Sequence, residues 1–334
     1  MSIEPSPLMW MVRAGQEGRW IDLFSSEGVV GLGWGEAGDL SQCQSKPDLL
    51  LAVSAAYPNK RDGSSAAAAS QLWRFQSELK VGDAVVTYDR SSRLYLLGEI
   101  NSPVAYADPK TDGMTVQRAV NWRATVSRDS LTPDSRNRLG STLSLFKVAA
   151  TTADELNRLA AGETVMPSIP EPADEIIDTF DGVADEAILR IADKVSALSW
   201  YDMQRLVAAL LRAMGYRTEI SPYGPDRGKD IFASPDGFGF EQPRIAVEVK
   251  HRPGQKIDAP TLRSFLGGRH KDDRGLFVST GGFSKDAYYE ADRAPIPLKL
   301  MTLDELARAV VDNYDKFDSE GRTLLPLVRL YWPA

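Results

Sequence analysis

Residues 244–252 read RIAVEVKHR, and this stretch decides how the second half of the chain is interpreted. Successive side chains of a β-strand point to opposite faces, so Ala246, Glu248 and Lys250 share one face and the valines share the other. An acid and a base therefore occupy positions where apolar residues would pack better. Taken alone, the pair fits either a functional site or a solvent-facing ion pair on an edge strand, which would contribute little stability.

An aspartate upstream adds a possible chemistry to this pair. Asp230 ends the segment GPDRGKD, directly before the apolar run IFA. Carboxylates of Asp230 and Glu248 on neighbouring strands can hold a hard divalent cation such as Mg²⁺ (or Mn²⁺), and the carbonyl of Val249 can supply a further oxygen. Lys250 would then orient or deprotonate an attacking water, since a desolvated lysine loses its proton more readily. As a bare pattern the three residues are a weak signal, because it is frequent by chance.

The elements around these residues alternate between helices and strands. Hydrophobic periodicity predicts an amphipathic helix over 202–216, which Gly215 can end. The further predicted elements are strands near 217–221, 229–233, 244–250, 275–280 and 298–301, and helices over 259–268, 284–294 and from Leu303 onwards. The order is that of a mixed α/β domain.

The run from Met203 to about Leu306 resembles the Mrr-like catalytic domain of the PD-(D/E)xK nuclease superfamily. The motifs that carry the resemblance occur in family order and cover about a third of the chain: MQRLVAALLRAMGY, DRGKDIFA, AVEVKHR, LRSFLGG, GLFVSTGGFSKDAYYEAD and KLMTLDELA. The resemblance implies a restriction-endonuclease-like α/β/α fold. It also implies that Asp230 and Glu248 bind metal and that Lys250 assists the nucleophile.

One position departs from the family pattern, and four others are candidates for contacts to DNA. Gln204 stands on the first helix where members often carry glutamate; its amide oxygen can accept a hydrogen bond but adds no negative charge, which puts a second metal in doubt. His251 and Arg252 follow the motif and either contact phosphate or end the strand in solvent. Ser284 and Lys285 begin a helix, where an anion could bind, although ordinary capping explains them as well.

The first part of the chain reads as short strands. Runs rich in Val, Tyr, Leu and Trp predict strands at 10–15, 28–34, 83–89, 93–100 and 119–126, and a helix is predicted over 66–79. This order fits a half-open β-barrel with one or two helices. The segments MWMVRAG, GVVGLGWGEAGDL, FQSELKVGDAVVTYD and RLYLLGEI are similar to a PUA/EVE-like module of the kind joined to Mrr-like nucleases, although the match is looser.

Related modules are similar to readers of modified bases, which lift one base out of the duplex into a pocket. Trp34, Trp10, Tyr88 and Trp122 could stack on such a base, and Asp39 could bind its edge. Taken singly, each aromatic fits the barrel core better than the wall of a pocket. Trp34 is the first choice because GLGWGEAGD surrounds it with glycines, which would allow a ligand to approach closely.

Composition sets the remaining expectations. The 334 residues carry a net charge of −7, and residues 200–300 are mildly basic, with 16 Lys+Arg against 13 Asp+Glu. Cys43 is the single cysteine, no apolar run approaches bilayer length and the N-terminus lacks a signal pattern, so we expect a cytoplasmic protein and no membrane partner. The Pro- and acid-rich stretch predicts a linker at 162–184 between a reader domain (1–161) and a nuclease domain (185–334).

These observations predict an α+β and α/β chain that acts as a modification-dependent, type IV-like DNA endonuclease. Its partner would be double-stranded DNA carrying modified bases. One domain holds one site and both strands must be cut, so a homodimer or higher homo-oligomer is expected. Two alternatives stay open: an inactive nuclease fold that only binds nucleic acid, and a nuclease that acts on RNA or branched DNA.

Overall fold

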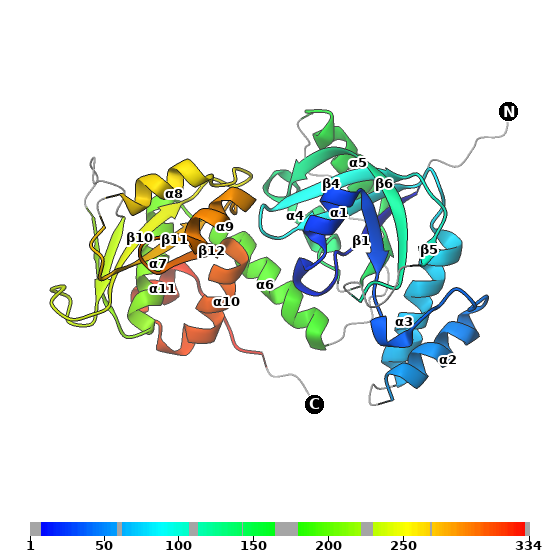
Figure 1. Ribbon diagram of the computed structural model, residues 1–334, viewed down its shortest axis with the longest axis horizontal. Helices are drawn as coiled ribbons and strands as arrows, with labels where there is room; N and C mark the ends of the chain where they lie inside the picture. The colour runs from blue at the N-terminus through cyan, green and yellow to red at the C-terminus, as the bar shows by residue number, and fades with distance from the viewer. Residues whose placement is uncertain are drawn as a thin grey trace. The chain divides into compact units, whose positions relative to one another are not determined.

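The computed structural model describes residues 8–58, 62–106, 113–141, 143–163, 180–221, 230–267 and 269–330. The chain divides into two compact units, the first built mainly from residues before 179 and the second mainly from residues after it. Each unit has its own sheet (Figure 1). Within the described ranges, every helix is too short or too polar to cross a bilayer.

The first unit is a curled half-barrel, as predicted. Its sheet has the strand order β2-β6-β4-β3-β1-β7, with β5 paired to β6. The strands are β1 (Met9–Val12), β2 (Val29–Leu32), β3 (Ala84–Asp89), β4 (Leu94–Ile100), β5 (Ala105–Tyr106), β6 (Val116–Ser127) and β7 (Leu145–Lys147). The long strand β6 pairs with β2, β4 and β5 and therefore curls the sheet.

The prediction of one or two helices in this unit was wrong. The described residues contain α1 (Ile21–Glu27), α2 (Lys46–Ala56), α3 (Asp62–Trp73), α4 (Pro133–Arg138) and α5 (Ala150–Ala160). The predicted helix over 66–79 corresponds to α3 continued by a π-helical turn, Arg74–Glu78. Buried Arg118 donates to the carbonyls of Phe75 and Gln76 at 3.2 and 3.0 Å, which satisfies backbone groups of that turn.

The second unit is a five-stranded sheet covered by helices on both faces. The strand order is β12-β11-β10-β9-β8; the pairs β8–β9 and β9–β10 are antiparallel, and β10–β11 and β11–β12 are parallel. The strands are β8 (Arg217–Ile220), β9 (Ile231–Ser234), β10 (Arg244–Lys250), β11 (Asp273–Ser279) and β12 (Leu298–Thr302). The helices are α6 (Phe180–Ser196), α7 (Trp200–Ala213), α8 (Ala259–Leu266), α9 (Lys285–Asp292), α10 (Leu303–Asn313) and α11 (Ser319–Leu324).

Two apolar cores hold the helices to this sheet. Val247 and Val249 of β10 belong to the core with α7 and α10, whereas Ala246 belongs to the core with α8 and α9. Figure 1 shows these two helix layers on either side of the sheet. Side-chain caps start four of the helices: Ser199, Asp258, Ser284 and Thr302 each accept a backbone N–H at the start of α7, α8, α9 and α10. The predicted α/β/α fold is therefore confirmed.

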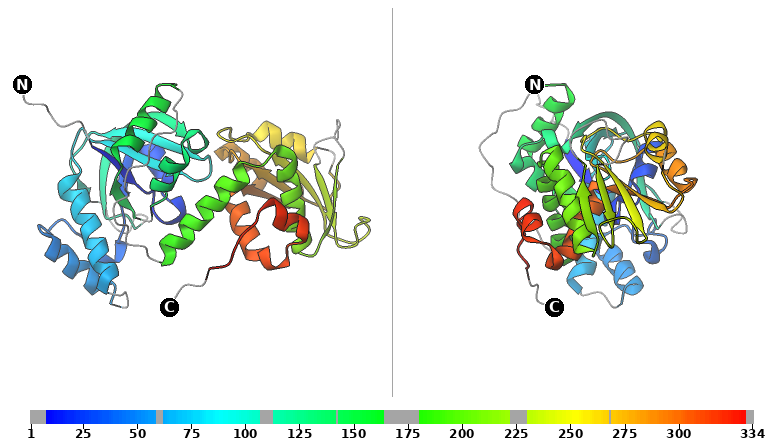
Figure 2. Two further views of the ribbon diagram at one scale, coloured as in Figure 1. Left: turned by 180° about the vertical axis from the view of Figure 1, so that it is seen from behind. Right: turned by 90° about the vertical axis from the view of Figure 1, so that its left-hand side faces the viewer.

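Helices α6 and α11 were not predicted. Helix α6 begins at Phe180, so residues 180–184 of the predicted linker are helical, while residues 164–179 lie outside the described residues. Helix α11 is joined to α7 by the ion pairs Arg205–Glu320 and Arg212–Asp318, at 2.7 and 2.6 Å. The view from behind in Figure 2 shows α11, in red, beside α7, in green. Both helices thicken the layer that supports β10.

Candidate active site

The three residues of the nuclease motif meet at one end of the central strand. Val247 of β10 pairs with Ile231 of β9, and the N–H of Asp230 donates to the carbonyl of Val247 at 2.9 Å. Asp230 therefore lies beside the last residues of β10, where Glu248 and Lys250 stand. Antiparallel pairing thus brings together residues that are separated in sequence by a hairpin.

Glu248 and Lys250 form a half-sheltered ion pair. Lys250 Nζ lies 2.6 Å from Glu248 Oε1; the side chains are 32% and 7% exposed. β10 is the third of five strands, so the reading of a solvent-facing pair on an edge strand was wrong. Because Val247 and Val249 enter the core with α7, the alternation of a strand points Glu248 and Lys250 toward the α8–α9 side. The covering layer explains why Glu248 is buried.

Asp230 is fixed by the backbone between these two side chains. The N–H of Val249 donates to Asp230 Oδ2 at 2.6 Å. A hydrogen bond from a backbone N–H to a carboxylate favours the ionised form and sets its orientation. Val249, predicted to supply a carbonyl oxygen, thus contributes its amide to the arrangement that the structure shows.

Burial dominates the electrostatics of Glu248. It raises the pKa of the Glu248 carboxyl above the ordinary glutamate value; the nearby charge of Asp230 raises it further, and Lys250 and Arg269 act in the opposite direction. Sequence reasoning missed Arg269. Its guanidinium carbon lies 4.5 Å from the centroid of the Phe265 ring, close enough for a cation–π contact, and its Nε donates to the Phe265 carbonyl. The site therefore combines two acidic side chains, Asp230 and Glu248, with two basic ones, Lys250 and Arg269.

The donor set fits a divalent cation that keeps most of its water. Asp230 and Glu248 offer two carboxylates whose mutual repulsion a cation would relieve, and Mg²⁺ is usually held in proteins by one or two carboxylates. Among the described residues, no three His, Cys, Asp or Glu side chains gather into a larger metal-binding group. The arrangement therefore fits one Mg²⁺-like ion better than a protein cage for a soft metal.

The other nuclease candidates are spread around this centre. Gln204 lies on α7 and is 6% exposed. Both ring nitrogens of His251 are hydrogen-bonded: Nε2 lies 3.0 Å from the Leu198 carbonyl oxygen, and Nδ1 lies 3.2 Å from Thr280 Oγ1. Since a carbonyl can only accept, Nε2 donates, and the ring ties the end of β10 to the segment before α7. His251 thus has a structural role in this arrangement.

Three predicted phosphate contacts lie on the outside of the unit. Arg252 and Lys285 are exposed. Ser284 caps α9 by accepting the N–H of Ala287 at 3.2 Å. The loops that carry them run side by side, because Ile257 pairs with Phe283 as an isolated bridge. All three remain candidates for phosphate contacts.

The five candidates for a base pocket do not gather in one place. Trp10 is fully buried, and its Nε1 donates to Asp83 at 3.2 Å. Trp34 and Trp122 are half-buried and pack against the same core as Trp10, where Trp122 Nε1 donates to the Phe24 carbonyl at 2.7 Å.

The other two candidates lie elsewhere in the first unit. Tyr88 belongs to the core on the opposite face of the sheet, with its ring 4.7 Å from that of Tyr95. Asp39 lies in an exposed turn, where the N–H and hydroxyl of Ser41 donate to its carboxylate and lower its pKa. The three tryptophans therefore lie on one face of the sheet, and Tyr88 and Asp39 lie away from them.

The glycines around Trp34 have a packing role. A Cβ on Gly33 would come within 2.2 Å of the Trp20 ring and 2.5 Å of the Gly113 carbonyl. A Cβ on Gly35 would come within 3.0 Å of Gly113 Cα. These glycines therefore let the Trp34 turn lie close to the backbone of Gly113 and to Trp20.

Comparison with known proteins supports the assignment of the second unit. Residues 195–310 match a family model described as a restriction endonuclease, which confirms the resemblance to Mrr-like restriction endonucleases for this part of the chain. Residues 10–145 match a family described only as a domain of unknown function. An uncharacterized protein of Sinorhizobium fredii, y4cE, is 29% identical over 114 residues; the match covers 33% of this chain and 29% of that protein.

Two solved structures align with most of the chain. The restriction endonuclease MspJI in complex with a 27-mer oligonucleotide aligns with a TM-score of 0.33 and 14% identity, covering 94% of this chain and 68% of that one. The DNA modification-dependent restriction endonuclease AspBHI aligns with a TM-score of 0.32 and 16% identity, covering 89% of this chain and 79% of that one. These superpositions are too loose to match individual residues.

The raised pKa of Glu248 predicts a stability effect that needs no substrate. Below the pKa of an unfolded glutamate, about 4.3, the carboxyl is protonated in both states; above the raised folded-state pKa, its ionisation destabilises the fold. Glu248→Gln should therefore raise the Tm in EDTA at pH 7.5, and the gain should shrink toward pH 4. Thermal unfolding of wild type and variant at both pH values measures it.

The same melts report on the cation. Mg²⁺ at pH 7.5 should raise the Tm of the wild type and leave that of Glu248→Gln almost unchanged. Glu219→Gln, at an exposed position of β8, is the matched control and should alter neither response. A Gln variant that is less stable than wild type at pH 7.5 would contradict this account of the electrostatics.

Proposed function

We propose that this chain is a modification-dependent DNA endonuclease whose second unit hydrolyses phosphodiester bonds. The observation that carries the proposal is the cluster of Asp230, Glu248 and Lys250 on the central strand of a restriction-endonuclease domain. A carboxylate pair and a lysine, half-sheltered together, suit phosphodiester hydrolysis better than a purely structural role.

Each residue of the cluster has a separate role in this proposal. Asp230 and Glu248 would hold a Mg²⁺ ion, which when bound would stabilise the charge that develops on a phosphoryl oxygen. Lys250, held at 2.6 Å from Glu248, would orient the attacking water and, after losing its own proton to solvent, would accept the water's proton as a neutral amine. Val249 N–H keeps the Asp230 carboxylate aimed at the same place. The buried surroundings strengthen each of these interactions.

The first unit would select the substrate. A half-barrel with three tryptophans on one face, of which Trp34 and Trp122 are half-buried, supports a role in stacking on a base. Flipping a base out of a duplex costs a few kcal/mol, and stacking on an aromatic ring returns about 1–3 kcal/mol per base. A modified base that adds contacts would tip this balance, which makes selection by modification physically reasonable.

Gln204 keeps an inactive, purely binding nuclease fold as the second candidate. The Gln204 amide is buried on α7, at a position where members of the Mrr-like family often carry a carboxylate. If this position serves the metal, Gln204→Glu should lower the Mg²⁺ concentration for half-maximal cleavage by about an order of magnitude, since oxygen ligands of higher charge bind Mg²⁺ more tightly. Gln204→Leu, which keeps the bulk, is the control. An unchanged Mg²⁺ requirement in Gln204→Glu would remove this helix from the metal site.

The type of nucleic acid is tested directly. Wild-type protein with Mg²⁺ is incubated with modified duplex DNA, unmodified duplex DNA, branched DNA and RNA of matched sequence under one salt condition. Cleavage of the modified duplex alone supports the proposal. Cleavage of RNA or of branched DNA instead would favour the alternative nuclease, and binding without any cleavage would favour the inactive fold.

A further inference from the structure

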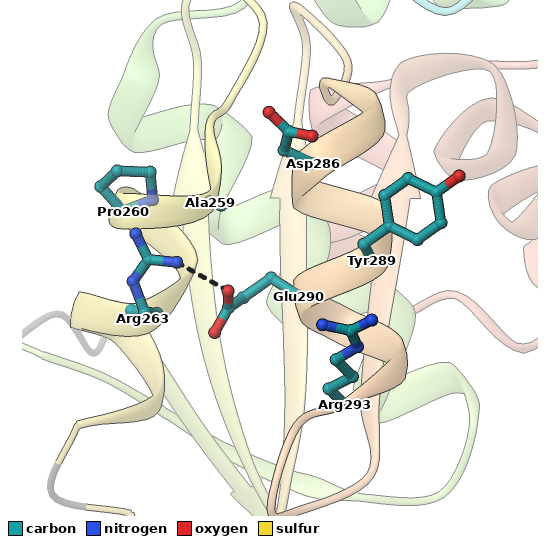
Figure 3. A pocket seen from close by; sticks show the side chains of 7 residues that line it. All are labelled: Ala259, Pro260, Arg263, Asp286, Tyr289, Glu290 and Arg293. Atoms are coloured by element: carbon teal, nitrogen blue, oxygen red, sulfur yellow. Dashed lines mark hydrogen bonds and ion pairs between the residues drawn. The ribbon is translucent and has the colours of Figure 1, made fainter.

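A groove between α8 and α9 takes no part in the site described above. It has a volume of about 490 Å³ and lies on the outside of the second unit. Figure 3 shows it from close by, with α8 on one side and α9 on the other. Its polar walls consist of two arginines, two acids and a tyrosine: Arg263, Arg293, Asp286, Glu290 and Tyr289.

The charges of α9 follow a defined order along this groove. Asp286, Glu290 and Arg293 stand at positions i, i+4 and i+7, which lie on one side of a helix. Glu290 Oε2 is bound by Arg263 Nη1 at 2.7 Å. Within the described ranges Asp286 and Arg293 are exposed and have no ion-pair partner in their own chain. Asp286 and Arg293 therefore lie two helical turns apart, and each can form an ion pair with a group of opposite charge from outside the chain.

We propose that this face binds the same face of a second copy of the chain. If two α9 helices pair antiparallel about a two-fold axis between residues 289 and 290, Asp286 of each faces Arg293 of the other. Tyr289 then faces Glu290, and its hydroxyl can donate to the carboxylate oxygen that Arg263 leaves open. Asp286 and Arg293 are seven residues apart, which is about 10.5 Å along a helix. The two-fold axis therefore gives one Asp286–Arg293 contact at each end of the paired helices.

A second copy fits this face better than a polyanion does. The groove carries two positive and two negative side chains, so it offers no net attraction for nucleic acid. A two-fold interface must instead be complementary to itself, and an acid and a base placed symmetrically about one point meet that condition. Tyr289 is 63% exposed at that point, and tyrosine and arginine are enriched among the residues that dominate interfaces.

The pairing would also set the distance between two nuclease sites. Helices α8 and α9 begin just after the loops that leave β10 and β11, and β10 ends at Lys250. Only this consequence, two cuts at a fixed spacing, rests on the proposed function; the self-association does not. A cleavage-dead Lys250→Ala chain should therefore dimerise like the wild type.

The test uses charge reversal in the full-length chain, measured by sedimentation velocity over a range of concentrations. Wild type should be a dimer. In Asp286→Arg, both contacts between positions 286 and 293 join two arginines, and in Arg293→Asp both join two aspartates. Each variant should therefore self-associate about tenfold or more weakly than the wild type. In an equimolar mixture of these two variants every contact is again an opposite pair, so the mixture should form heterodimers of wild-type affinity.

Asp292→Arg is the matched control, because it makes the same charge change at an exposed position of α9 that does not line the groove. It should dimerise normally, and circular dichroism should show all variants folded. A monomeric wild type would overturn the proposal. So would a mixture that behaves as the sum of its parts, or an Asp292→Arg variant as weak as Asp286→Arg.

Discussion

Lys250→Ala should lower the rate of DNA cleavage by about 100- to 10,000-fold while leaving DNA affinity nearly unchanged. Lys250 Nζ lies 2.6 Å from the buried Glu248 carboxylate, where as a neutral amine it can take a proton from a water, and its side chain is only 32% exposed to solvent. Its loss therefore removes proton transfer and orientation and few contacts to DNA. Single-turnover cleavage and a binding titration, made at one salt concentration, separate the two effects.

Asp230→Asn extends the same test to the carboxylates. The asparagine oxygen can still accept the Val249 N–H, so the local fold should persist while the negative charge is lost. Cleavage should fall at least as far as in Lys250→Ala, and excess EDTA should abolish it in the wild type. Lys271→Ala, at an exposed position before β11, is the control and should cleave normally. Full activity in either site variant would refute the assignment.

Trp34→Ala should weaken binding of modified duplex DNA by about ten- to a hundredfold and affect unmodified DNA much less. The reason is the loss of one stacking surface, worth about 1–3 kcal/mol. Affinities are measured in the cleavage-dead Lys250→Ala background, so that Mg²⁺ can be present. Trp73→Ala is the matched control, because Trp73 is another half-buried indole packed against the same core. Equal losses on both duplexes, or equal losses in both variants, would make Trp34 a core residue only.

Local sequence patterns were sufficient to predict much of the second unit. The alternation in RIAVEVK placed Glu248 and Lys250 on one face, Ser284 caps a helix as expected, and the helix predicted from Leu303 begins at that residue. The position of β10 in the middle of the sheet could not be predicted in this way, since strand order depends on pairings between distant segments. For that reason the nine residues alone favoured an edge strand.

The missed features share the same cause. Arg269 follows a glycine in the loop before β11, and nothing in GGRHKDD shows that its charge reaches Glu248. The tryptophans of the first unit illustrate the converse. Trp10 and Trp34 were both predicted as candidates for stacking on a base, yet one is fully buried and the other half-buried, because burial depends on which segment covers each ring. Residue type predicts the chemistry that a side chain can perform, and tertiary contacts decide whether it does.

One measurement tests the central claim most directly. Wild-type protein and Lys250→Ala are each incubated with Mg²⁺ and one duplex sequence, prepared unmodified, methylated, hydroxymethylated or glucosylated, and the products are resolved on a denaturing gel. The account predicts that the wild type cuts at least one modified duplex, spares the unmodified one and loses its activity in EDTA, and that Lys250→Ala cuts none of them. Equal cleavage of all four duplexes, or cleavage by Lys250→Ala, would contradict it.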